Sequence, residues 1–129
     1  MQEIKKSLAP VFEKMSDRIA VAYLFGSHAK GEAGPGSDVD LAVLLHDSVG
    51  NIGLDVRLDL YADCGRALKR NDIDVVVLNT ARNLFLLNDI VRTGVVLFDC
   101  NTELREEFEV MVVHDFIDFR EHRKRTLGV

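Results

Sequence analysis

The feature that most constrains this chain is a pair of aspartates, Asp38 and Asp40, ten residues after a Gly-Ser dipeptide. The dipeptide ends one apolar run, 19–25, and the aspartates open another, 38–45, which predicts two buried strands. Strand side chains alternate with period two, so both carboxylates project from the same face. Adjacent carboxylates repel each other, and a divalent cation is the simplest way to neutralise them.

The segment between these strands, residues 26–37, has the composition of a phosphate-binding loop. Gly26 and Ser27 offer backbone N–H groups and a hydroxyl to phosphate oxygens. A simple helix N-cap role for Ser27 is compatible, since a cap also directs N–H groups toward an anion. Lys30 in the loop and Ser37 at its end are further candidates for nucleotide binding, although Lys30 is equally well interpreted as a solvated lysine. Carboxylates beside such a turn predict a nucleoside-triphosphate site.

A second acidic motif, Asp72-Ile73-Asp74, begins a third predicted strand over 73–78. Asp72 and Asp74 share one face, and one of them is expected to complete a metal site or to take the proton from an attacking hydroxyl. Periodicity alone does not choose between them. We favour Asp74 because its apolar neighbours indicate a deeper position, where a carboxylate is costly unless it has a partner or a function. Asp72 follows basic residues, where a solvated charge is common.

The remaining segments predict helices around a small sheet. Helices are expected over 2–15, 51–70, 83–93 and 101–125, and a short strand over 95–98. The stripes predicted to face the core are Leu54, Leu58, Tyr61 and Leu68 in the second helix, and Leu104, Phe108, Met111, Val112, Phe116 and Phe119 in the last. The order indicates an α/β (α+β) fold, a small mixed sheet flanked by helices. We expect residues 1–129 to form one domain.

Composition narrows the class of function. A formal net charge of −5 argues against a broad basic surface, so direct nucleic-acid binding is not expected. Cys64 and Cys100 lack metal-ligand spacing and are expected to be reduced thiols of a cytoplasmic protein. The sequence shows neither an apolar run of membrane-spanning length nor a signal peptide. The basic run 120–125 is interpreted as a solvated helix end.

The segments LFGSHAKGEAGPGSDVDLAVLL and IDVVVLN resemble the DNA polymerase beta-type nucleotidyltransferase superfamily, and within it the minimal nucleotidyltransferase (MNT) antitoxins. The resemblance implies a polymerase beta-like fold in which Asp38, Asp40 and Asp74 are the catalytic triad and bind one or two Mg²⁺ ions. One departure is His28, where many relatives carry arginine, so a phosphate contact from this position is not favoured, while the metal site is unaffected. MNT antitoxins transfer AMP from ATP to a tyrosine of a cognate HEPN ribonuclease toxin and so silence it. A toxin partner and a homo- or hetero-oligomer are implied.

Three functions therefore remain open. The first is an adenylyltransferase antitoxin, in which a protein acceptor supplies the missing wall of the acceptor pocket, because little chain follows the core. The second is a small-molecule nucleotidyltransferase, for instance of the aminoglycoside type, although such enzymes generally carry a second domain. The third is an antitoxin that acts by binding alone, against which the intact set of acids argues. We expect the first.

Overall fold

The computed structural model describes residues 2–46 and 52–127. Its elements are α1 (Gln2–Lys14), β1 (Ile19–Phe25), β2 (Val39–Leu45), α2 (Ile52–Leu68), β3 (Ile73–Val77), α3 (Leu84–Thr93), β4 (Val95–Asp99) and α4 (Thr102–Leu127). The predicted order of helices and strands is confirmed, with ends that differ by one or two residues. Residue 51, predicted to open the second helix, lies outside the described residues.

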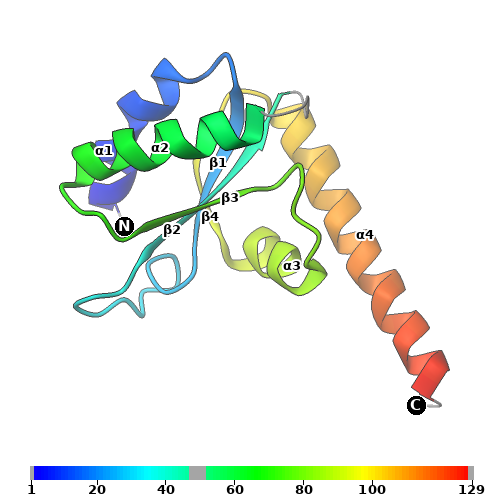
Figure 1. Ribbon diagram of the computed structural model, residues 1–129. Helices are drawn as coiled ribbons and strands as arrows, with labels where there is room; N and C mark the ends of the chain where they lie inside the picture. Colours follow the sequence, from blue (N-terminus) through cyan, green and yellow to red (C-terminus); the bar gives the residue numbers. More distant parts are fainter. Residues whose placement is uncertain (1, 47–51, 128–129) are drawn as a thin grey trace.

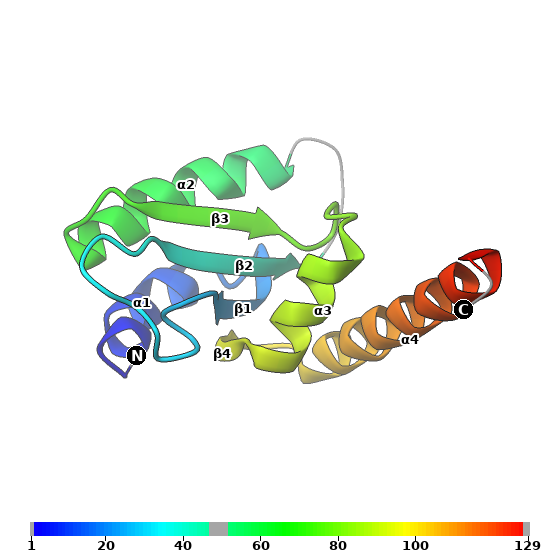
Figure 2. The ribbon, with the colours of Figure 1, turned by 90° about the horizontal axis from the view of Figure 1, so that it is seen from below.

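These strands form a four-stranded mixed sheet in the order β3-β2-β1-β4 (Figures 1 and 2). β1 runs antiparallel to β2 and to β4, whereas β2 and β3 are parallel and are joined through α2. The register pairs Asp40 with Phe25 on one side and with Asp74 on the other. Asp40 therefore lies between the end of β1 and the start of β3.

Two layers of helices cover the sheet, as Figure 1 shows, with α1 and α2 on one face and α3 and α4 on the other. Alternate residues of β2 divide between the two cores. Leu41 and Val43 pack in the core with α1 and α2, and Ala42 and Leu44 pack in the core with α3 and α4. By this alternation Asp40 belongs to the face that carries α3 and α4.

The stripe predicted to bury α2 is largely wrong. Leu54, Leu58 and Tyr61 are 59%, 61% and 49% exposed, although Leu68 packs against the core as expected. The fully buried side chains of α2 are instead Val56, Leu60 and Cys64. Both stripes repeat at helical spacing, so periodicity alone does not show which one meets the sheet.

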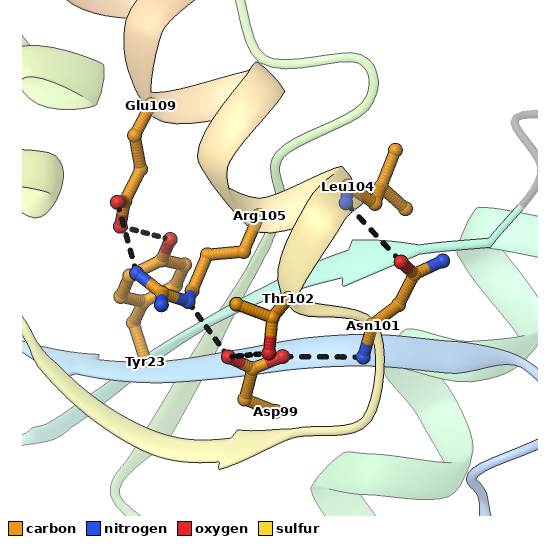
Figure 3. A network of polar contacts seen from close by, with 7 residues as sticks. All are labelled: Tyr23, Asp99, Asn101, Thr102, Leu104, Arg105 and Glu109. Atoms are coloured by element: carbon orange, nitrogen blue, oxygen red, sulfur yellow. Dashed lines mark hydrogen bonds and ion pairs between the residues drawn. The ribbon is translucent and has the colours of Figure 1, made fainter.

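The first half of α4 is attached to the sheet by a polar network (Figure 3). Arg105 donates to Asp99 at the end of β4 (2.7 Å) and to Glu109 one turn later (3.0 Å). The Tyr23 hydroxyl of β1 donates to Glu109 (2.7 Å). Burial, together with Glu109, raises the pKa of Tyr23, so this hydroxyl keeps its proton and remains a donor. The network fixes the direction in which α4 leaves the sheet.

The second half of α4 extends past the sheet (Figures 1 and 2). Phe108 and Val112 are buried as predicted, but Met111 and Phe119 are exposed. The predicted apolar face thus meets the sheet only near the start of the helix. None of the described helices is long and apolar enough to cross a membrane.

Candidate active site

Asp38, Asp40 and Asp74 meet at one end of the sheet. Asp40 and Asp74 are direct neighbours on the parallel strands β2 and β3, and Asp38 immediately precedes β2. Asp38 and Asp74 are exposed and Asp40 is half-buried. The structure therefore brings all three predicted acids together on the part of the sheet face where β2 and β3 begin.

The three carboxylates form one electrostatic group. Partial burial, followed by the charges of Asp74 and Asp38, raises the pKa of Asp40 above its ordinary value, and His28 acts weakly in the opposite direction. Ionising Asp40 is therefore costly in the protein alone. A bound cation would offset that cost.

Asp72 has a different role from Asp74. Arg70 donates to both carboxylate oxygens of Asp72 (2.5 and 2.6 Å) and to the carbonyl of Ser37 (2.6 Å). The hydrogen bonds from Arg70 hold the pKa of Asp72 below its usual value. Through Arg70, Asp72 is connected to Ser37 at the end of the glycine-rich loop. Both carboxylate oxygens of Asp72 therefore already accept hydrogen bonds within the protein.

The preference for Asp74 agrees with this geometry, but the expectation that Asp74 is the deeper acid is wrong. Asp74 is exposed, and Asp72 is the more buried of the two. What distinguishes Asp74 is its register beside Asp40, a long-range feature that local hydropathy does not report. Arg70 was also missed. Its only local signal was an arginine two residues before an acid, and its contact with Ser37 lies 33 positions away in sequence.

We predict that Asp74→Asn lowers nucleotidyl transfer by about a hundredfold or more, the scale of a lost general base or metal ligand. Asp72→Asn keeps a hydrogen-bond acceptor for Arg70 and is expected to change the rate by less than about fivefold, in line with a mainly structural ion pair. Initial rates of both variants, measured at saturating ATP, make the comparison. A larger loss for Asp72→Asn would exclude Asp74 as the third acid.

Gly26 packs directly against Asp40. Its φ is +75°, and a Cβ at this position would lie 2.4 Å from Oδ2 of Asp40, closer than real contacts allow. The chain then forms a turn in which Lys30 N–H donates to the Gly26 carbonyl (3.2 Å) and Glu32 N–H to that of Ser27 (2.9 Å). The half-buried Ser27 opens this turn beside the acids.

The other predicted loop residues have contacts within the protein. The Lys30 ammonium lies 3.4 Å from the Asp89 carboxylate of α3, which connects the loop to that helix. The Ser37 hydroxyl accepts from the N–H of Gly34 (2.9 Å), and the Ser37 carbonyl lies 3.2 Å from Nε2 of His28, which donates when that nitrogen carries the proton. Ser37 and His28 therefore close the loop.

The donor set fits Mg²⁺. This ion prefers oxygen ligands and is usually held by one or two carboxylates together with water and substrate phosphates. Across residues 2–46 and 52–127, no group of three or more His, Cys, Asp or Glu side chains is already arranged to hold a metal ion. A cation at Asp38, Asp40 and Asp74 would therefore depend on the nucleotide for part of its coordination.

A separate hollow of ≈ 500 Å³ lies between α3 and α4. Its lining consists of Phe85, Asn88, Arg92, Phe116, Phe119, Arg120, Arg123 and Lys124. The Arg120 guanidinium lies 6.0 Å from the centre of the Phe116 ring. Part of the basic run that was interpreted as a solvated helix end thus surrounds an aromatic hollow, which includes neither the acids nor the loop.

A glycine-rich turn packs against paired carboxylates, and a third acid lies on the adjoining parallel strand, which is the arrangement predicted from the sequence for a nucleoside-triphosphate site. Residues 6–103 match the family described as Polymerase beta, Nucleotidyltransferase, and the chain belongs to this family. The family and the mixed sheet predicted from the sequence are both confirmed.

Relatives within this family give more detail. The protein adenylyltransferase MntA of Shewanella oneidensis is 35% identical over 77 residues, which are 60% of this chain and 52% of that protein. The matched region thus spans about half the length of that curated relative. A crystal structure of a toxin–antitoxin with AMP-PNP has a TM-score of 0.76 and 26% identity, over 96% of this chain and 95% of that chain.

A further structure supports the fold alone. It is a tri-AMPylated Shewanella oneidensis HEPN toxin in complex with MNT antitoxin, with a TM-score of 0.71 and 24% identity over 98% of this chain and 95% of that chain. The resemblance to MNT antitoxins inferred from the motifs is confirmed by the family match, by the similarity to MntA and by the toxin–antitoxin structure with AMP-PNP.

Proposed function

We propose that this protein is an antitoxin that transfers AMP from ATP to a tyrosine hydroxyl of a cognate HEPN toxin in the cytoplasm. The observation that carries the proposal is the contact between Gly26 and Asp40, with Asp38 and Asp74 beside it. The similarity to the adenylyltransferase MntA supports AMP as the transferred group. The similarity to a toxin–antitoxin structure with AMP-PNP supports ATP as the donor and a toxin as the partner.

In this mechanism the loop binds the triphosphate, and the three acids bind the cation and accept a proton. The residues that would hold Mg²⁺ are Asp38, Asp40 and Asp74, and the ion would supply charge neutralisation at the phosphates. Gly26 allows the backbone to approach the phosphates, and Ser27 offers a hydroxyl and an N–H. Asp74 flanks Asp40 on the side of β3, opposite Gly26, and would take the proton of the tyrosine hydroxyl. The tyrosine oxygen bonds to the α-phosphorus, and the α–β bridge breaks to release pyrophosphate.

The test is intact-mass spectrometry of the HEPN protein encoded beside this chain, after incubation with the protein, ATP and Mg²⁺. We expect a gain of one or more AMP units, absent with the Asp38→Asn/Asp40→Asn variant. Inhibition of the toxin without any mass change would replace the proposal with an antitoxin that acts by binding. A panel of small acceptors, including aminoglycosides, tests the remaining alternative, and label on one of them would overturn the protein acceptor.

A further inference from the structure

The open edge of the sheet and the adjoining side of α2 form a groove that reaches Asp74. Two adjoining hollows of ≈ 460 and ≈ 250 Å³ lie here and share Leu54, Arg57, Asp74 and Val75 in their linings. The exposed side chains of Leu54, Leu58 and Tyr61 lie along this groove. We call it the β3 groove. The three exposed side chains along the β3 groove belong to the stripe of α2 predicted from the sequence to face the core.

The backbone of β3 is arranged to accept another strand. β3 is an edge of the sheet, and its only neighbour in the described sheet is β2. Val39 N–H donates to the Asp72 carbonyl (2.9 Å) and Leu78 N–H to the Val43 carbonyl (2.8 Å). The backbone N–H and C=O groups of the even-numbered residues of β3 therefore point toward β2. By alternation, the N–H and C=O groups of Val75 and Val77 point to the open side. An extended peptide can pair with such an edge.

The chemistry of transfer indicates what the β3 groove receives. In an in-line displacement the attacking oxygen and the leaving pyrophosphate lie on opposite sides of the phosphorus. The phosphate-binding loop follows β1 and contacts Asp40 from that side, whereas Asp74 flanks Asp40 on the side of β3. If the triphosphate lies toward β1, the acceptor arrives from β3, where the groove is open.

We propose that the β3 groove docks the acceptor segment of the partner protein, and this inference rests on the proposed function. The segment binds in extended form, pairs with the free edge at Val75 and Val77, and places its tyrosine hydroxyl at Asp74. Its apolar side chains pack on Leu54 and Leu58. An acidic side chain of the segment faces Arg57, whose side chain lines both hollows.

The first test changes the groove without touching the acids. Leu58→Glu alters a side chain that is 61% exposed, so the fold is expected to persist. We expect kcat/KM for AMP transfer to the toxin to fall by about tenfold or more, mainly through KM, because desolvating the new charge opposes docking. Binding of a fluorescent ATP analogue with Mg²⁺ should be unchanged.

The matched control is Val110→Glu on α4, where the side chain is 69% exposed and lies outside the groove. It should leave kcat/KM unchanged. Loss of activity in Val110→Glu with full activity in Leu58→Glu would overturn the proposal and place docking on α4. If Leu58→Glu instead breaks a self-association of this chain, measured by sedimentation without the toxin, and the toxin kinetics are unaffected, the occupant is a second copy and the proposal fails.

Hydrogen exchange supplies a readout that does not depend on transfer. In the Asp40→Asn variant, which is expected to lack transfer activity, adding the toxin should slow exchange at the amides of Val75 and Val77, because the added strand bonds to them. The amide of Val76 faces β2 and should change little. Unchanged exchange at Val75 and Val77 in a complex that forms would overturn strand addition. Slowed exchange together with no AMP transfer by the native protein would refute the proposed function while retaining the docking site.

Discussion

Asp40→Asn is expected to lower AMP transfer by about 10³-fold or more while leaving the fold intact, which corresponds to about 4 kcal/mol of lost transition-state stabilisation. Asp40 is the central member of the acidic group. The charges of Asp74 and Asp38 both raise its pKa, and its carboxylate lies against Gly26. Asparagine keeps the shape but removes the charge that a cation requires. Initial rates of AMP incorporation by intact mass, with circular dichroism to verify folding, measure the effect. A variant with native activity would exclude a metal-binding role for Asp40.

The stability of the same variant supplies an independent control. The pKa of Asp40 is raised in the folded protein by burial and by two like charges, so its ionised form is disfavoured on folding. Without divalent cations, Asp40→Asn should therefore be more stable than the native protein at pH 8, by about 0.5 kcal/mol on the scale of partly exposed charge pairs. As the pH falls through the raised pKa, the native carboxyl becomes protonated and the difference should disappear. Urea unfolding at several pH values shows whether the sign is correct.

Local patterns were enough to predict the strands and the groups they carry. The ten-residue spacer between Ser27 and Asp38 joins two antiparallel neighbours, so a short connection alone brings the Gly-Ser turn to Asp40. Period-two alternation then sets the face of Asp38, Asp40 and Asp74. These relations depend on residues close in sequence or on a single βαβ crossover, which explains why they could be derived without the structure.

Features that depend on long-range packing could not be derived in this way. α2 carries two apolar stripes, and the choice between Leu54 and Val56 as the buried one depends on where the sheet lies. The exposure of Asp74 depends on β3 being an edge strand, which the order of elements does not specify. Arg70 contacts Ser37 across 33 positions of sequence, so no local window contains the pair. In each case a partner distant in the chain decides the environment.

Gly26→Ala is expected to reduce AMP transfer by about a hundredfold or more and to destabilise the fold by about 2–3 kcal/mol. Two costs combine. A φ of +75° is strained for alanine by about 1–2 kcal/mol. The new Cβ would also lie 2.4 Å from Oδ2 of Asp40, so the carboxylate must move. Small displacements of a reacting group cost about a hundredfold in rate.

Gly31→Ala separates these two costs. Gly31 has a φ of +71° in the same loop, but a Cβ there would meet nothing within 4 Å. It should therefore show the backbone strain alone, with a loss of stability of about 1–2 kcal/mol and transfer activity close to that of the native protein. Urea unfolding and AMP incorporation, measured for both variants, give the comparison. Equal losses of activity would mean that the conformation of the loop governs the site; loss in Gly26→Ala alone would show that glycine is required there because it sets the position of Asp40.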